Sequence, residues 1–130
     1  MNNNINNKQM MDIDDHQQFI DAIPRLNGQM LQTGKYTGVE ISIVGKYLGT
    51  NTENQTIQEF QASDKQRFNV VLETNQNWNG YETKYIEIRG FVNNDGSITQ
   101  SSYQEYGDFF PIKMWDKVVT LMHQLSLIHI

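Results

Sequence analysis

Residues 85–98 read YIEIRGFVNNDGSI, the clearest β-hairpin pattern in the chain. Ile86, Ile88 and Val92 recur with a two-residue period, so an extended chain places them on one face. The side chains between them face the other way: Tyr85, Glu87, Arg89 and Phe91. Residues 93–96 have the composition of a tight hairpin turn, and the chain from 97 to about 106 is then the partner strand. An antiparallel sheet is therefore predicted here.

Three more strands are predicted upstream from the same two-residue period. The first begins at Tyr36 and continues to Leu48, with Gly45 inside it, where a glycine often marks a bulge or a sharp bend. The second covers 57–62 and the third 68–72, separated by a tight turn. Five short, evenly spaced strands followed by a helix favour an all-β fold with a C-terminal helix, built as a five-stranded closed barrel rather than a sandwich.

The stretch 111–128 is predicted to form one helix with more apolar surface than a small domain needs. Pro111 suits a first helical position, and Asp108 can supply a capping oxygen. Apolar residues recur at alternating intervals of four and three and form a heptad-like seam along the helix: Met114, Val118, Leu121, Leu125 and Ile128. A second stripe lies beside it: Trp115, Val119 and Met122. Together they cover about half of the circumference, whereas packing on one core needs a stripe about 100° wide. We expect one stripe to pack on the domain and the seam on other chains; a fully buried core helix is the alternative.

The segment before the barrel is expected to take part in the fold. A short helix is predicted over 11–23, and Leu26, Met30 and Leu31 are spaced so that they can turn inward together and cover an open end of the barrel. The first residues lack apolar periodicity and are rich in asparagine, which is typical of a flexible arm. The predicted division is a flexible asparagine-rich arm at 1–11, a pre-barrel segment at 12–35, the barrel at 36–107 and a C-terminal assembly helix at 108–130.

Composition limits the classes of function. The chain has 130 residues, enough for one domain, and a formal net charge of -5 at pH 7. A freestanding nucleic-acid binder usually carries a basic excess, and this chain carries none. The absence of cysteine excludes disulfides, thiolate metal ligands and cysteine nucleophiles. No signal-peptide pattern opens the sequence and no apolar run approaches the length of a membrane span, so an intracellular protein without a membrane partner is expected.

The residue patterns of enzymes and metal sites are not found. Gly45 and Lys46 lack the other residues of a phosphate-binding loop. The three histidines do not have metal-ligand spacing, and His123 falls on the polar side of the predicted helix. We therefore expect a protein that is not an enzyme, with no catalytic residue, no cofactor and no metal site. Glu87 and Arg89 are expected to pair on an exposed strand face.

Several short motifs occur in a characteristic order. They are 24–27 followed by Met30 and Leu31, Gly38 with 44–46, the strand 85–92, the hairpin 95–98, the turn 107–110, and helix residues Trp115, Val118, Val119 and 121–123. In this order they resemble the small-subunit family of replication protein A, the eukaryotic heterotrimer that coats single-stranded DNA. The resemblance implies an OB-fold barrel in a nuclear, non-catalytic structural subunit. It also implies that the C-terminal helix packs with helices of a large and a middle subunit, and that single-stranded DNA is held mainly through the complex.

Two sets of candidate site residues follow. The partner-binding set is Met114, Trp115, Val118, Val119, Leu121, Met122 and Leu125. OB-folds bind single strands by stacking bases on aromatic side chains beside a basic groove. The candidate nucleic-acid contacts are therefore Trp78, Tyr81 and Tyr85, with Lys46, Arg67, Lys84 and Arg89 nearby in sequence. The alternative is that these aromatic side chains only pack on the barrel, on a loop or on a neighbouring subunit.

Two other functions stay open at this point. The loops at 49–56 and 75–83 are longer than the family's usual connections, which leaves open a small subunit of a telomere- or telomerase-associated complex of the same kind. An autonomous OB-fold nucleic-acid binder is the second alternative, and a basic excess would have favoured it.

Overall fold

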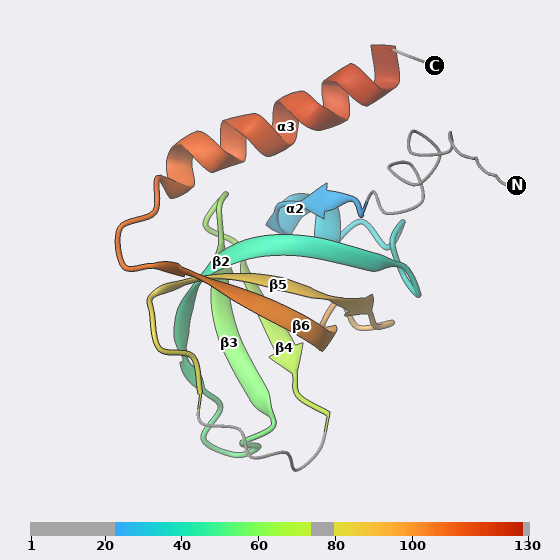
Figure 1. Ribbon diagram of the computed structural model, residues 1–130. Helices are drawn as coiled ribbons and strands as arrows, with labels where there is room; N and C mark the ends of the chain where they lie inside the picture. Colours follow the sequence, from blue (N-terminus) through green and yellow to red (C-terminus); the bar gives the residue numbers. More distant parts are fainter. Residues whose placement is uncertain (1–22, 74–79, 129–130) are drawn as a thin grey trace, which may run out of the picture.

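A computed structural model describes residues 23–73 and 80–128 of the chain. The predicted arm at 1–11, nearly all of the helix predicted over 11–23, and Trp78 lie outside the described residues. Figure 1 shows the elements, which follow the chain in the order β1 (Arg25–Leu26), α2 (Gly28–Leu31), β2 (Glu40–Thr50), β3 (Ile57–Ala62), β4 (Arg67–Val71), β5 (Tyr85–Val92), β6 (Ile98–Gly107) and α3 (Ile112–Ile128).

Five of the strands close into a barrel. β2 pairs with β3 on one side and with β5 on the other, and β3 pairs with β4 and β5 with β6, all antiparallel. A short parallel pairing of β4 with β6, at Val70 and Val71, closes the ring. The predicted five-stranded barrel with a C-terminal helix is thus confirmed. A sixth strand, β1, lies parallel to β2 with Leu26 opposite Ile43. It was not predicted, because two residues are too few to show a period.

Two glycines inside strands permit close approach of their neighbours. A Cβ atom on Gly45 would lie 3.0 Å from the Phe68 ring, and one on Gly90 would lie 2.1 Å from the Thr99 carbonyl oxygen. Gly45 therefore makes room for a core aromatic ring. Of the bulge or sharp bend expected at Gly45, the bulge is not found there, because the register of β2 against β3 shifts around Leu48 instead.

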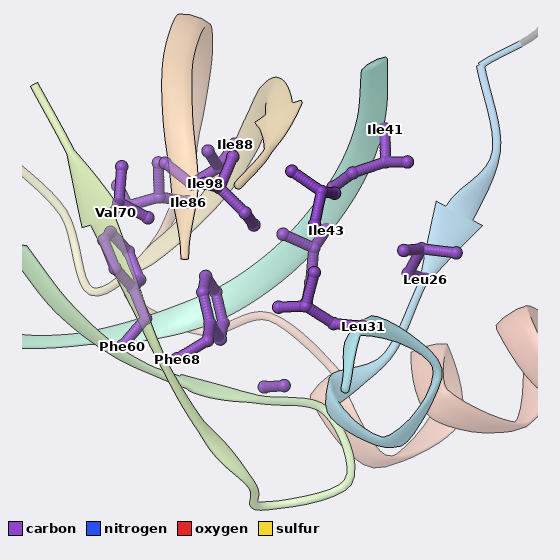
Figure 2. Close-up of a cluster of buried hydrophobic side chains, with 12 residues drawn as sticks. Leu26, Leu31, Ile41, Ile43, Phe60, Phe68, Val70, Ile86, Ile88 and Ile98 are labelled. Atoms are coloured by element: carbon purple, nitrogen blue, oxygen red, sulfur yellow. The ribbon is translucent and has the colours of Figure 1, made fainter. Parts of the chain in front are cut away.

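The hydrophobic core fills the barrel and extends into the pre-barrel segment. Its buried members are Leu26, Leu31, Ile41, Ile43, Phe60, Ala62, Phe68, Val70, Ile86, Ile88, Val92 and Ile98. Figure 2 shows Leu26 of β1 and Leu31 of α2 on the same side of the core as Ile41 and Ile43 of β2. Met30 packs against this cluster and is partly buried. The predicted inward turn of the pre-barrel leucines is confirmed, and these side chains close one end of the barrel.

Helix α3 lies along the side of the barrel on which α2 and β1 lie (Figure 1). The Pro111 carbonyl accepts the first helical hydrogen bond, from Trp115 N at 3.0 Å. The predicted cap by Asp108 is wrong: the Asp108 carboxylate instead accepts a hydrogen bond from Lys84 N at 2.9 Å. Asp108 therefore ties the turn before the helix to the start of β5.

Candidate functional site

The side of α3 that faces the barrel, which we call its inward face, is held against the domain by hydrogen bonds as well as by apolar burial. Asp116 Oδ1 accepts hydrogen bonds from Asn27 Nδ2 at 3.2 Å and from the Ser63 hydroxyl at 2.8 Å. Val119, three residues further on, is 0% exposed. His123 Nε2 lies 2.7 Å from the Arg25 carbonyl oxygen. Because that oxygen can only accept, Nε2 carries the proton and donates.

His123 lies on the polar side of the helix with Asp116, as predicted, and this side faces the domain. Its ring faces the domain and makes an edge contact with the Tyr36 ring, with centroids 6.5 Å apart. Spacings of three and four place Asp116, Val119 and His123 on one helical face. That face is partly polar, because the partner atoms on the barrel side are a backbone carbonyl, a hydroxyl and an amide.

The opposite face of α3 is apolar and has no partner within the described chain. Met114 is 61% exposed, Leu121 53%, Leu125 46% and Met122 40%, and Val118 beside them is half-buried. We call these five residues the outer face of α3. A fully buried core helix is excluded by their exposure. Large apolar side chains gathered on one surface of a small domain usually mark a binding site.

Two residues of the predicted partner-binding set do not lie fully on this outer face. Val119 is completely buried under the helix, so a partner cannot reach it while the helix stays docked. Trp115 is half-buried and contacts the Phe110 ring, with centroids 6.1 Å apart. Helical geometry explains both positions, because Trp115 lies between the seam and the inward face, and Val119 lies on the inward face itself. We leave Val119 out of the partner-binding surface for this reason.

Tyr81 packs into the mouth of the barrel. Its hydroxyl donates to Gln100 Oε1 at 2.7 Å, and its ring lies 4.9 Å from Tyr47, 5.2 Å from Phe60 and 5.2 Å from Tyr103, centroid to centroid. Burial, with smaller contributions from Tyr47 and Tyr103, raises the pKa of Tyr81 well above its usual value. Tyr81 is therefore partly buried and packs against the barrel core.

Tyr85 lies on the barrel exterior, at one end of a row of outward-facing side chains. Backbone pairing places Tyr85 opposite Lys46, Lys46 opposite Gln61, and Gln61 opposite Arg67. We call these four residues the outer row. The residues that alternate with them, such as Ile86 and Phe68, are buried in the core. The outer row thus crosses β5, β2, β3 and β4 on the outside of the barrel.

Three residues of the predicted nucleic-acid site, Lys46, Arg67 and Tyr85, lie in this row. Gln61 was missed, because a cross-strand register is needed to place it between the two cations. Arg89 does not belong to the row: its Nε lies 3.4 Å from a Glu87 carboxylate oxygen. The backbone N–H of Lys84 is bound by Asp108, one residue before the row begins.

Glu87 is a buried carboxylate rather than the exposed one that was predicted. It accepts hydrogen bonds from the Ser42 hydroxyl at 2.6 Å and from the Tyr106 hydroxyl at 2.7 Å, in addition to the Arg89 contact. Burial opposes ionisation of Glu87, but these hydrogen bonds and the Arg89 charge outweigh it and lower its pKa. Burial and the neighbouring Glu87 raise the pKa of Tyr106 to about 12. The predicted pairing of Glu87 with Arg89 is present, between a buried carboxylate and a partly exposed arginine.

We expect Glu87→Gln to destabilise the barrel at neutral pH and to cost less at acidic pH. A carboxylate with a lowered folded pKa contributes stability that is complete above the unfolded pKa of about 4.3 and is lost as the pH falls through the folded value. Loss of the charge-assisted hydrogen bonds should cost about 1–3 kcal/mol near pH 7. Urea unfolding at about pH 7 and about pH 3 measures the difference. Glu53→Gln, in an exposed loop, is the matched control and should cost little at either pH. An equal loss for Glu87→Gln at both pH values would contradict the assignment.

Within 23–73 and 80–128, no group of three metal-ligating side chains converges. The same residues include no helix long and apolar enough to cross a membrane. What the described surface offers is an apolar helix face and a short row that combines cations with an aromatic ring.

Comparison with known families agrees with this arrangement. The family described as replication factor A protein 3 matches residues 17–128. The chain belongs to this family. Because the match runs from the pre-barrel segment to the end of α3, the resemblance seen in the sequence motifs is confirmed over the whole described fold. Family members are non-catalytic subunits of replication-protein-A-like assemblies that bind single-stranded DNA.

Solved structures share the fold of this replication factor A protein 3 family member. A structure of U. maydis replication protein A bound to ssDNA aligns with a TM-score of 0.68 and 19% identity, over 82% of this chain and 94% of that one. The telomere capping protein Ten1 from Saccharomyces pombe aligns with a TM-score of 0.61 and 10% identity, over 79% and 99%. The S. pombe Stn1-ten1 complex aligns with a TM-score of 0.62 and 10% identity, over 80% and 94%. Among curated protein sequences, none matches the chain significantly.

Proposed function

We propose that this chain is the small structural subunit of a heterotrimeric replication-protein-A-like complex, and that it joins a large and a middle subunit through the outer face of α3. The observation that supports this proposal is the exposure of Met114, Leu121, Met122 and Leu125 on a helix that already has a separate, buried face toward its own barrel. In this proposal the folded unit consists of the pre-barrel segment, 12–35, and the barrel, 36–107. The C-terminal segment, 108–130, is the assembly helix, and the arm at 1–11 has no role in assembly.

The spacing of the outer face fits helix-on-helix packing. Met114, Val118, Leu121 and Leu125 follow one another at intervals of four, three and four residues, which is the repeat of a helical bundle seam. Two partner helices, one from each larger subunit, would cover the seam and the adjoining Met122 together. Burial of an exposed leucine or methionine contributes about 1.5–3 kcal/mol, so a few such residues can support a stable assembly.

We further propose that the complex, and not this chain alone, provides most of the affinity for single-stranded DNA, and that it acts in the nucleus. The net charge of -5 supports the first point, because few cations are available to displace counterions from a phosphate backbone. A second candidate is the corresponding subunit of a telomere-capping complex, which the shared fold with Ten1 supports. The family match favours the general replication assembly over the telomere-dedicated one.

Affinity purification of the tagged full chain, followed by mass spectrometry, tests the assignment. We expect two larger OB-fold subunits in stoichiometric amounts. Recovery of general replication factors would support the first candidate, and recovery of telomerase or telomere-capping components would support the second. A chain that elutes alone as a stable monomer would contradict both.

A further inference from the structure

We propose that the pair Asn27–Gly28 is a site of spontaneous deamidation, that docking of α3 and of the turn between β3 and β4 suppresses the reaction, and that its product loosens α3. An asparagine followed by glycine is prone to this reaction, because glycine has no side chain to hinder attack by its own backbone nitrogen. The modification goes beyond the proposed function, and its chemistry does not depend on any partner subunit.

The reaction needs water and no enzyme. The Gly28 backbone nitrogen loses its proton and attacks Asn27 Cγ, so that a C–N bond forms while the bond from Cγ to Nδ2 breaks and ammonia leaves. Water then opens the resulting cyclic imide. Attack of water at Cγ gives aspartate, and attack at the backbone carbonyl carbon gives isoaspartate, in each case by breaking the bond from that carbon to the Gly28 nitrogen.

Both residues of this labile pair are required by the fold. Asn27 caps α2, because its Oδ1 accepts a hydrogen bond from Met30 N at 3.0 Å, and its Nδ2 donates to Asp116 Oδ1 at 3.2 Å. A Cβ atom on Gly28 would lie only 2.6 Å from Gln66 Cβ, so the close approach of the turn between β3 and β4 permits only glycine here. The fold therefore keeps a reactive sequence that a different pair of residues would avoid.

The docked elements protect the pair at each reacting atom. Gly28 N donates a hydrogen bond to Asp64 Oδ1 at 3.1 Å, and loss of a proton beside a carboxylate is unfavourable. The leaving nitrogen, Asn27 Nδ2, is bound by Asp116, which the Ser63 hydroxyl also holds at 2.8 Å. Figure 1 shows this turn reaching toward α3. Asn27 itself is only 6% exposed, which limits access of water. Deamidation therefore requires that α3 and the turn first move away.

The product would act on α3 more than on α2. Aspartate is as good a helix cap as asparagine, so an aspartate at position 27 still accepts the hydrogen bond from Met30 N. Toward Asp116 the change is opposite, because the amide donor becomes a second carboxylate and the like charges repel. An isoaspartate adds a methylene group to the main chain and disturbs the cap as well. Deamidation therefore marks chains in which α3 has been undocked, and it keeps the helix from docking again.

Peptide mass spectrometry of the full chain, incubated at mildly alkaline pH, measures aspartate and isoaspartate at position 27. A reaction that requires local opening is slowed by the small fraction of open molecules, so the native chain should react at least about tenfold more slowly than the chain unfolded in urea. Asp116→Ala removes the acceptor of Asn27 Nδ2 and should accelerate the native-state reaction at least about threefold. Val70→Ala, a core truncation in β4 outside this network, is the control and should change the rate little.

Three results would overturn this part of the proposal. An absence of reaction in urea would show that the pair is not a deamidation site. Equal rates in buffer and in urea would show that the fold does not protect it. Equal acceleration by Asp116→Ala and Val70→Ala would show that the reaction proceeds through global unfolding and that docking of α3 does not control it.

Hydrogen exchange measured by mass spectrometry tests the effect of the product on α3. An undocked helix of this length is only marginally stable, so Asn27→Asp should raise exchange in α3 about tenfold while exchange in the barrel strands stays unchanged. Asn27→Asp/Asp116→Asn exchanges donor and acceptor and should restore the protection of α3. Unchanged exchange in Asn27→Asp, or a failure of the double variant to restore protection, would overturn the effect on α3. Neither measurement involves a partner subunit, so these results are independent of whether the proposed assembly forms.

Discussion

Replacing Leu121 and Leu125 with glutamate should abolish co-purification of the partner subunits while the barrel stays folded. Both side chains are about half exposed in the chain alone, so the isolated subunit tolerates the change. In the assembly, each substitution removes apolar burial worth about 1.5–3 kcal/mol and places an unpaired charge at the contact. A combined loss of at least about 3 kcal/mol corresponds to a more than 100-fold weaker complex. Co-purification from cells and the strand circular dichroism of the purified chain measure the two effects.

The control variant Lys117→Gln/Gln124→Glu changes the net charge by the same amount on the polar flank of the same helix. It should leave assembly nearly intact, because neither residue belongs to the outer face of α3. If both partners are retained at normal stoichiometry by Leu121→Glu/Leu125→Glu, the outer face is not the partner-binding surface. If the double glutamate variant unfolds the barrel, the outward orientation of these leucines is refuted.

Leu31→Ala should lower the free energy of unfolding by about 2–4 kcal/mol, a large share of the stability of a small domain. Leu31 is 1% exposed and lies in the core, although it precedes the first barrel strand by nine residues in sequence. Truncation of the Leu31 side chain leaves a cavity at one end of the barrel, the end that the pre-barrel segment covers. Urea unfolding followed by circular dichroism provides the measurement.

The matched control is Leu48→Ala, the same substitution at a β2 position that is 38% exposed. It should cost less than about 1 kcal/mol, because less apolar surface is returned to water. Equal costs for the two variants would show that the pre-barrel segment does not contribute to the core and acts only as a linker.

Most of the barrel could be predicted because its strands have one buried and one exposed face. The period of two then locates the strands, and β3 and β5 have the predicted bounds. Glu87 is an exception: although it alternates with the core residues of β5, it is buried and hydrogen-bonds to Ser42 of β2 and Tyr106 of β6. Periodicity within one strand cannot reveal side-chain contacts with neighbouring strands, so the carboxylate was expected in solvent.

The candidate sites were less predictable, since they depend on contacts between distant parts of the chain. The heptad spacing separated the seam of α3 from its other faces, and the exposed side chains agree with that separation. The inward face was missed because Asp116 and His123 are polar, and their partners are Asn27, Ser63 and the Arg25 backbone. The position of Tyr81 could not be predicted, because a tyrosine in a polar loop gives no sign that it packs against the barrel core.

In the proposed assembly, the polar contacts between α3 and the domain would make partner binding depend on completed folding. Asp116 and His123 hold groups that belong to the pre-barrel segment and to the turn after β3, regions separated from the helix by 53 to 98 residues in sequence. The helix is therefore held in place only after these regions have come together. In a chain with a displaced pre-barrel segment, the helix would lose these contacts. Binding of the partners would then include the entropic cost of ordering the helix. In the proposed assembly, the three contacts would therefore favour incorporation of correctly folded subunits over immature ones.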